Sequence, residues 1–306
     1  RQKLKEDLAN RACTARTQPA HHDSIKRLGK NLMPGKYHEA QITDREKRTI
    51  LVSGATGAIG KAIARQIAAQ DNDGVILLAR SEQKARQAVV EIMRTTGSEN
   101  VWYELADLSR RTSIQVLAER WPGRLDVLIN NAAVTPRRRQ ETPEGIEMQF
   151  ATNVLGYFWL TQAFRDLLIK SAPARVINVA SYWAGDLDIN DLEFKRRRYN
   201  NGAAYRQSKQ ANPMLSVAFA ERLKPHQVTV NACHPGEVNS QISKDLGFRG
   251  SESPDAGART PVWLATDPTG ALETGKYFEH MREARDRFAA DRLAVEALYQ
   301  ICLGYE

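Results

Sequence analysis

The pair of residues with the most specific chemistry in this sequence is a tyrosine followed four positions later by a lysine. Tyr205 and Lys209 fall in a segment with helical patterning, so both side chains lie on the same helix face. Tyrosine has an ordinary pKa near 10 and exchanges protons poorly at neutral pH, whereas a nearby ammonium stabilises the phenolate and lowers that pKa. We therefore predict that Tyr205 is the general acid in the reduction of a carbonyl and the general base in the reverse oxidation.

Ser181 is the second candidate for this chemistry. It follows an apolar run, 175–180, that is typical of a buried strand. Its hydroxyl is predicted to donate a hydrogen bond to the oxygen of the reacting carbonyl. A Tyr-x-x-x-Lys pair alone often marks only a solvated helix face, and the upstream serine strengthens the catalytic interpretation.

A glycine-rich turn follows the first apolar strand, Thr49–Ser53. Glycines at a strand-to-helix turn let the backbone approach a phosphate, and the following helix N-terminus favours negative charge. A tight turn without a ligand is the alternative reading of the same residues. The candidate cofactor-binding residues in this turn are Gly54, Thr56, Gly57, Ile59 and Gly60.

Arg80 stands at the end of the second predicted strand, twenty residues after Gly60. An acidic residue at this place would bind the adenosine ribose hydroxyls of NAD, and this sequence has none there. A guanidinium can pair with a 2′-phosphate and stack on adenine. We therefore predict NADP(H) as the cofactor, against the alternative that Arg80 is an ordinary surface arginine.

The elements that must position these residues alternate regularly from residue 49. Short β-rich runs are followed by helical segments, which predicts βαβ units. The fold class is therefore α/β, a Rossmann-type doubly wound parallel sheet in a single domain. We expect strands at 49–53, 75–79, 101–105, 126–130, 175–180 and 227–232, and helices at about 59–70, 82–95, 109–120, 143–170 and 203–223.

Three segments are predicted: a basic N-terminal extension at 1–48, a nucleotide-binding domain at 49–278, and a helical tail at 279–306. A short amphipathic helix is expected around Leu4–Leu8, and Thr142 is expected to cap the 143–170 helix, with Pro143 in its first turn. The tail has one apolar face, which favours packing on its own domain over contact with a partner or membrane.

The chain has 306 residues and a net charge of +8. Residues 1–48 contribute +6, and the clusters Arg137–Arg139 and Lys195–Arg198 contribute +7, so the remainder is slightly acidic. Nucleic acid is not expected as a partner, because none of its binding motifs surrounds the clusters. Both clusters are expected near the mouth of the active site, as a solvated surface or as a rim that attracts an anionic, amphiphilic or membrane-presented substrate.

Cys13, Cys233 and Cys302 are an odd number of widely spaced cysteines, which predicts an intracellular, reducing compartment, cytoplasm or organelle interior, and no metal site. No run approaches 18 apolar residues, so a membrane-spanning helix is not expected. The first residue is Arg1 and not methionine, so we expect that residues upstream of it were removed or left out, and a targeting segment or membrane anchor could be among them.

The motifs together resemble the short-chain dehydrogenase/reductase superfamily, across about 49–303. The resemblance is specific because the motifs occur in the expected order: the Gly54–Gly60 turn, Asp107-Leu108, Asn130-Asn131-Ala132-Ala133, Asn153, Ser181, Tyr205-Arg206-Gln207-Ser208-Lys209 and Pro235-Gly236.

The resemblance implies further roles for individual residues. Asn153 would complete a proton relay through water, and Lys209 would also bind the nicotinamide ribose. Asp107 would lie near the adenine, with Asn130 and Pro235 near the ribose and nicotinamide.

Two departures from the pattern of the superfamily concern the cofactor turn and the catalytic helix. Ala58 occupies the usual middle glycine position, where its methyl is expected to narrow the approach to the pyrophosphate. Pro213 lies inside the predicted helix, where a proline costs about 3 kcal/mol or kinks the chain.

The branch looks like the retinol dehydrogenase-like group, on the long interval between Ser181 and Tyr205 and the terminal helix after Gly275-Lys276-Tyr277-Phe278. Such relatives favour hydrophobic carbonyls and alcohols, such as retinoids, sterols or fatty aldehydes. The prediction is thus an NADP(H)-dependent enzyme that acts on a small hydrophobic or amphiphilic carbonyl or alcohol. The oligomeric state stays open: members of the superfamily often pair as homodimers through the two long helices, here about 143–170 and 203–223, and the terminal helix could alter that arrangement.

A different class of function remains open. The chain could be an accessory or scaffolding subunit that keeps the nucleotide-binding fold, with residues 1–48 making a peripheral membrane or protein-complex contact. A nucleotide-sensing regulator is a third alternative. Turnover of aldehydes by the purified protein separates the enzyme from both.

Overall fold

The computed structural model describes residues 33, 47–70 and 73–306. Nearly all of the basic extension 1–48 lies outside the described residues, and so do the helix expected around Leu4–Leu8 and Cys13. Cys233 and Cys302 are buried free thiols.

One eight-stranded sheet forms the centre of the protein, in the order β3-β2-β1-β4-β5-β6-β7-β8. All neighbouring strands are parallel except β7 and β8. The strand order reverses between β1 and β4, and such a reversal opens a crevice at the carboxyl ends of the strands. The doubly wound parallel sheet expected from the sequence is confirmed. The strands are β1 (Arg48–Ser53), β2 (Asp73–Ala79), β3 (Val101–Leu105), β4 (Val127–Asn130), β5 (Ala174–Val179), β6 (Val228–Cys233), β7 (Tyr277–Glu279) and β8 (Arg282–Ala284).

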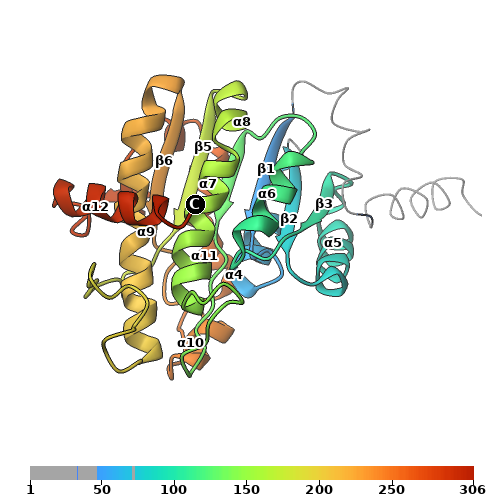
Figure 1. Ribbon diagram of the computed structural model, residues 1–306. Helices are drawn as coiled ribbons and strands as arrows, with labels where there is room; N and C mark the ends of the chain where they lie inside the picture. Colours follow the sequence, from blue (N-terminus) through green and yellow to red (C-terminus); the bar gives the residue numbers. More distant parts are fainter. Residues whose placement is uncertain (1–32, 34–46, 71–72) are drawn as a thin grey trace, which may run out of the picture.

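Helices cover both faces of the sheet, which is why the central strands read as continuous apolar runs (Figure 1). Side chains alternate between the faces, so that Leu51 packs into one layer and its neighbours Ile50 and Val52 into the other. The layer of Ile50 holds α4 (Ala58–Ala68), α5 (Glu82–Thr96) and α11 (Pro254–Thr266). The layer of Leu51 holds α6 (Arg111–Glu119), the π-helix η1 (Phe150–Leu155), α7 (Gly156–Ala163), α8 (Arg165–Lys170), α9 (Asn201–Leu223) and α12 (Arg292–Leu303).

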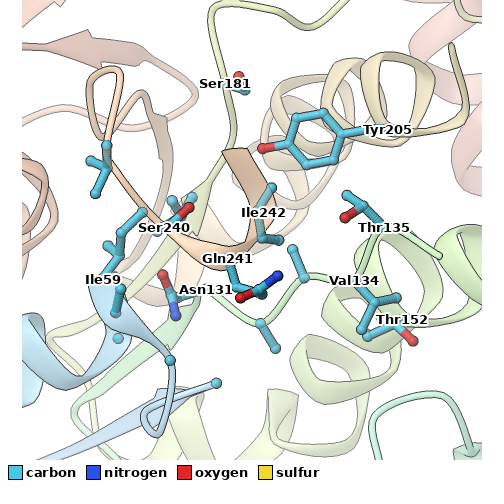
Figure 2. Close-up of a pocket in the computed structure, with 18 of the residues that line it drawn as sticks. Ile59, Asn131, Val134, Thr135, Thr152, Ser181, Tyr205, Ser240, Gln241 and Ile242 are labelled. Carbon is cyan, nitrogen blue, oxygen red and sulfur yellow. The ribbon is translucent and has the colours of Figure 1, made fainter. Parts of the chain in front are cut away.

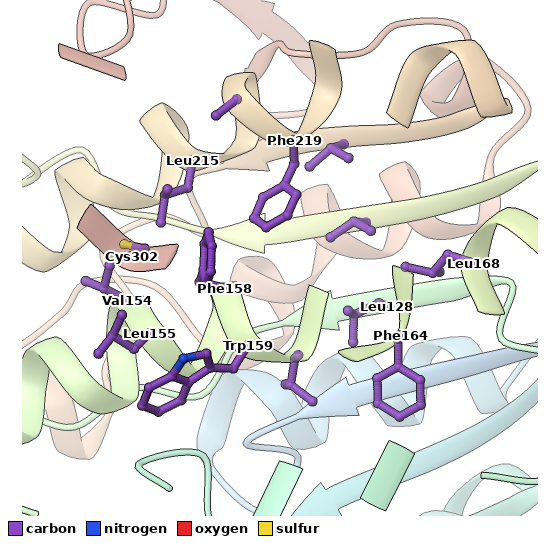
Figure 3. Packing of buried hydrophobic residues seen from close by; sticks show 14 of the residues in the cluster. Leu128, Val154, Leu155, Phe158, Trp159, Phe164, Leu168, Leu215, Phe219 and Cys302 are labelled. Carbon is purple, nitrogen blue, oxygen red and sulfur yellow. The ribbon is translucent and has the colours of Figure 1, made fainter. Parts of the chain in front are cut away.

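An aromatic cluster ties three of these helices together. Phe158 of α7, Phe219 of α9 and Tyr299 of α12 lie with their ring centroids 5.2–5.3 Å apart. Figure 3 shows Phe158 and Phe219 in this core, with Cys302 of α12 close by. Because α12 covers this part of α7 and α9, the apolar surface that the sequence suggested for a homodimer is partly buried within the protein's own chain.

The helix expected at 143–170 is wrong in its first turns and is not continuous. Thr142 does not cap it: the Thr142 carbonyl accepts the N–H of Gly145 at 2.9 Å, which closes a tight turn, and Gly145 has a φ of +81°. Glu141 and Glu147 then form an isolated β-bridge, so the helical chain begins only after this turn. The segment continues as η1, α7 and α8, with a turn at Phe164 between the last two.

The long helix α9 runs through Pro213 without a break. Its N-terminus is capped by the Asn200 side chain, which accepts the N–H of Ala203 at 2.9 Å. Pro213 is buried within the layer, so packing holds the helix together where the backbone loses one hydrogen bond.

The continuous helix expected at 279–303 is also wrong. Residues 277–284 form the β7–β8 hairpin, and α12 begins only at Arg292, where Asp291 caps it. Val295, Leu298 and Cys302 of α12 are buried, and the Arg222 guanidinium of α9 stacks 3.7 Å from the Tyr299 ring centroid. The expected packing of the tail on its own domain is confirmed, although Leu293 is 84% exposed.

Within residues 33, 47–70 and 73–306, no helix is both long and apolar enough to cross a bilayer. In the same part of the chain, His, Cys, Asp and Glu side chains nowhere gather in a group of three or more that could hold a metal ion.

Candidate active site

The turn between β1 and α4 is built for glycine at two positions. Gly54 has a φ of +64°, and a Cβ there would lie 2.7 Å from the Ala132 Cα. A Cβ on Gly60 would lie 2.4 Å from the Gly54 carbonyl oxygen and 2.6 Å from Asn131 Nδ2. Gly57 is less restricted, because its φ is −82° and a Cβ would meet only the Gly54 oxygen at 3.3 Å. The chain therefore needs glycine at 54 and 60 to pack β1, α4 and the loop after β4 together.

The N-terminus of α4 faces a cavity and carries no acidic residue in its first turn. Amide N–H groups at this end have no partner within the helix and favour an anion. Gly54, Thr56, Gly57, Ile59 and Gly60 all line the cavity, as does Ala58. The turn thus has the backbone approach and the electrostatics that a pyrophosphate requires.

Arg80 also lines the cavity, at the end of β2. Its side chain is exposed. The nearest carboxylate along the chain, Glu82, accepts hydrogen bonds from Arg86 and from Tyr103, which leave it little freedom to compete for Arg80.

Asp107 and Asn130, two further candidates for the cofactor, do not line the cavity. The Asp107 carboxylate accepts hydrogen bonds from the backbone N–H and the hydroxyl of Ser109, at 3.0 and 2.8 Å, and so shapes the turn into α6. Asn130 is fully buried and donates to Asn178 Oδ1 at 2.9 Å, between β4 and β5. Pro235, by contrast, is among the lining residues.

Ser181, Tyr205 and Lys209 meet on one wall of the cavity. Figure 2 shows the Tyr205 ring directed into the pocket from α9, with Ser181 beside it after the end of β5. The two hydroxyl groups interact, and the Ser181 side chain is 8% exposed. A substrate oxygen in this corner could therefore receive hydrogen bonds from both side chains.

The pKa of Tyr205 differs from the lowered value that the sequence predicts. Burial raises the pKa of Tyr205 to about 12, and the hydrogen bond with Ser181 only partly opposes this shift. Burial also lowers the pKa of Lys209 to about 7, because the charged ammonium loses its water. The expectation that Lys209 lowers the pKa of Tyr205 is wrong for this geometry. The Lys209 Nζ lies 6.0 Å from the Tyr205 ring centroid and donates to the Val179 carbonyl instead, at 2.7 Å.

Asn153 is fully buried in η1 and does not line the cavity. Its Oδ1 accepts the N–H of Val134 at 2.9 Å, and its Nδ2 donates to the Val134 carbonyl at 3.1 Å and to the Ser208 hydroxyl at 3.1 Å. Asn153 thus braces the loop after β4 against α9. A π-helical turn is uncommon and often marks a functional position, and here it carries Asn153.

Part of the cavity lining is apolar, and most of its residues were not predicted from the sequence. Trp183 and Phe248 lie with ring centroids 4.2 Å apart and with 35° between the rings. Val134, Met148, Ile242 and Leu246 complete these walls. The cavity as a whole has a volume of about 580 Å³.

Most of the cavity-lining residues that the sequence did not predict belong to the segment after β6. Ser240 caps the short helix α10 (Gln241–Asp245) and forms a capping box with Ser243. Figure 2 shows Ser240, Gln241 and Ile242 around the pocket. Their place in the sheet topology could have predicted them, because this segment follows the carboxyl end of a parallel strand, where ligands bind in such folds.

Comparison with known proteins identifies the family. A model of the short chain dehydrogenase family matches residues 48–248. Human retinol dehydrogenase 13 is 35% identical over 276 residues, which cover 82% of this chain and 83% of that protein. A putative daunorubicin C-13 ketoreductase from a Streptomyces species is 36% identical over 248 residues, covering 77% of this chain and 84% of that protein.

A solved structure extends the likeness to three dimensions. The crystal structure of a putative uncharacterized protein from Mycobacterium paratuberculosis superimposes with a TM-score of 0.70 and 28% identity, and covers 89% of this chain and 97% of that one. The parallel sheet with helices on both faces agrees with these matches. The chain therefore belongs to the short-chain dehydrogenase/reductase family of oxidoreductases, in its retinol dehydrogenase-like branch.

Proposed function

We propose that this protein is an NADP(H)-dependent oxidoreductase that transfers hydride between nicotinamide and a carbonyl or alcohol on a hydrophobic or amphiphilic substrate. The observation that carries the proposal is the cavity itself. The glycine turn, the Ser181–Tyr205 corner and an apolar wall all line this one cavity. Human retinol dehydrogenase 13, by its name, acts on a hydrophobic alcohol, which supports the same class of substrate here.

The residues of the cavity divide the chemistry between them. Bound NADPH would supply the hydride to the carbonyl carbon. Ser181 donates a hydrogen bond to the carbonyl oxygen and stabilises the negative charge that develops there. Tyr205 delivers its phenolic proton to the same oxygen, and the phenolate then recovers a proton from water.

The raised pKa of Tyr205 bears on how the rate of each direction depends on pH. A pKa of about 12 keeps the phenol protonated at neutral pH, which is the form that reduction requires. Oxidation requires the phenolate, so we expect the rate of alcohol oxidation to rise with pH toward this pKa, while the net direction is set by the concentrations of the substrates and of the two cofactor forms.

Lys209 and Asn153 support this wall in different ways. By family resemblance Lys209 binds the nicotinamide ribose, and its position on the cavity is compatible with that role. Asn153 holds Val134 in place from below the surface, so we assign it a positioning role, with participation in a proton relay remaining a prediction.

Arg80 is the basis for preferring NADP(H) over NAD(H). Its exposed guanidinium faces the cavity, and no acidic side chain occupies its position at the end of β2. A charged hydrogen bond to a 2′-phosphate contributes about 1.5–3 kcal/mol, or about 10- to 100-fold in affinity.

Steady-state kinetics with both cofactors test the preference. We expect a KM for NADPH well below that for NADH, and Arg80→Asp should shift the ratio of kcat/KM toward NADH by about 10- to 100-fold. Arg94→Asp, which changes an exposed arginine near the end of α5, is the matched control and should leave the ratio unchanged. A wild-type preference for NADH would overturn this part of the proposal.

A further inference from the structure

Four exposed arginines lie on two loops that hydrogen bonds join at the edge of the cavity, and the proposed chemistry uses none of them. None of the four is itself among the residues that line the cavity. Arg137 and Arg138 belong to the loop after β4, and Arg196 and Arg198 to the segment between β5 and α9. We call these four residues the rim arginines. Within the described part of the chain, no carboxylate forms an ion pair with any of them, whereas their neighbours Arg139, Lys195 and Arg197 pair with Glu141, Glu193 and Asp191.

Two hydrogen bonds join the loops that carry the rim arginines. Arg139 Nε donates to the Glu193 carbonyl at 3.0 Å, and the Tyr199 hydroxyl donates to the Pro136 carbonyl at 2.9 Å. Pro136 itself lines the cavity, as does Gln140. The two loops that carry the rim arginines therefore meet at the edge of the cavity, at Pro136.

The segment that carries Arg196 and Arg198 has a fixed shape. The carboxylate of Asp191, a residue only 5% exposed, accepts the backbone N–H groups of Lys195, Arg196 and Arg197, at 2.7, 3.1 and 3.0 Å. The same carboxylate binds the Arg197 guanidinium at 3.1 Å. Asp191 thus orders the backbone and neutralises Arg197, while the exposed side chains of Arg196 and Arg198 keep their charge.

The acidic residues of the cavity lie on other segments. Asp245 is in α10, where it accepts a hydrogen bond from Gln241, and Glu237 follows β6 and accepts one from the Tyr182 hydroxyl. The rim arginines therefore place unpaired positive charge on the β4 and β5 loops, whereas Asp245 and Glu237 place negative charge on the segment after β6. Charges of opposite sign at two places can orient a charged ligand as well as attract it.

We infer that the natural substrate is an anionic amphiphile, whose apolar body lies in the cavity and whose carboxylate or phosphate group contacts the rim arginines. This inference rests on the proposed function and adds the charge of the substrate to it. Guanidinium groups suit such anions because their N–H groups match the oxygens in pairs. Reduction would convert the aldehyde or ketone of this substrate, with one hydride from NADPH and one proton from Tyr205, into the alcohol.

The test compares ω-carboxy aldehydes of increasing chain length with their methyl esters, using purified wild-type protein and NADPH. We expect the acid to have a lower KM than its ester within one window of chain lengths, where the carboxylate reaches the rim. This difference should shrink at high ionic strength, because the charges are exposed. ω-Phosphate aldehydes of the same lengths show which of the two anionic groups is preferred.

Two variants locate the effect. Arg137→Gln/Arg138→Gln and Arg196→Gln/Arg198→Gln should each raise the KM of the acid by about 3- to 10-fold, with kcat and the kinetics of the ester unchanged. The control Arg94→Gln/Lys170→Gln removes two exposed cations at the amino ends of the strands and should change neither KM.

The possible results separate this inference from the proposed function. Turnover of acids and esters with equal KM at every chain length would overturn the inference alone. An equal rise of KM in the control variant would also overturn it, because the effect would then belong to the net charge of the protein. Absence of turnover with all aldehydes would overturn the proposed function, and this inference with it.

Discussion

The Lys209 ammonium donates a hydrogen bond of 2.7 Å to the carbonyl oxygen of Val179. Val179 is the last residue of β5, and Ser181 follows it by two positions. This contact therefore joins the helix that carries Tyr205 to the strand end that carries Ser181. Lys209 also donates to the Tyr157 hydroxyl at 3.3 Å, so the buried ammonium is held from two elements.

Burial of Lys209 should make stability depend on pH. The pKa of Lys209 falls to about 7 in the folded protein and is near 10.4 in the unfolded chain. Between these values the unfolded state binds more protons, so the free energy of unfolding rises with pH, by at most about 1.4 kcal/mol per unit. Urea unfolding at pH 7, 8 and 9 should show this slope in the wild type and a smaller one in Lys209→Met.

The exposed Lys84 provides the control for this measurement. Lys84→Met should keep the wild-type slope, since its ammonium is solvated in both states. An identical slope in the wild type and Lys209→Met would mean that the lysine is not desolvated as the structure indicates.

Stability and NADPH binding should depend on glycine at position 60 much more than on glycine at position 57. In Gly60→Ala the new methyl meets the Gly54 carbonyl and Asn131, so β1 and α4 must move apart, and we expect a loss of about 1–3 kcal/mol in stability together with weaker NADPH binding. Gly57→Ala should change both by much less. Chemical denaturation and fluorescence titration with NADPH measure the pair, and equal effects of the two substitutions would contradict the packing argument.

Asn153→Ala tests whether this residue braces the cavity or acts in the chemistry. The substitution removes both hydrogen bonds to the Val134 backbone and should cost about 1–3 kcal/mol of unfolding free energy. Because Val134 lines the cavity, we also expect a higher KM for the substrate. A fall in kcat with an unchanged KM and a stability change below about 0.5 kcal/mol would instead indicate a direct role in proton transfer.

The Trp183–Phe248 pair should select for apolar length in the substrate. Phe248→Ala removes one ring of the pair and should raise the KM of a long aliphatic aldehyde by about 5- to 30-fold, corresponding to about 1–2 kcal/mol. A short aldehyde such as propanal does not reach the pair and should keep its kcat/KM. Val116→Ala, at an exposed position on α6, is the control. An equal loss for short and long aldehydes would show that Phe248 acts through the fold and not through contact.

The alternation of β-rich and helical segments was sufficient to predict the sheet, because both faces of its central strands are covered and these strands are largely apolar. The sequence pattern did not predict the start of the 143–170 helix correctly. The capping pattern at Thr142-Pro143 occurs instead in a tight turn that Gly145 and the Glu141–Glu147 bridge stabilise. The β7–β8 hairpin was missed for a related reason. Both strands are three residues long, too short for a period to be read.

The sequence motifs correctly predicted that the glycine turn, Arg80, Ser181 and Tyr205 lie on the cavity. The first three directly follow predicted strands, and Tyr205 lies on a predicted helix. The motifs could not show that Asn153 and Asn130 are enclosed, because burial depends on contacts between distant segments. The predicted direction of the pKa shift of Tyr205 was wrong for the same reason. Spacing along a helix places Lys209 near Tyr205 but does not reveal that Val179 engages the ammonium.

The most direct test of the account is the turnover of a hydrophobic aldehyde by Tyr205→Phe compared with the wild type. The wild type should oxidise NADPH with the aldehyde present. Tyr205→Phe keeps the ring but lacks the only proton assigned to the substrate oxygen, so it should bind NADPH with unchanged affinity and show no measurable turnover. A Tyr205→Phe variant with a kcat near that of the wild type would contradict the role of Tyr205, and with it the proposed mechanism.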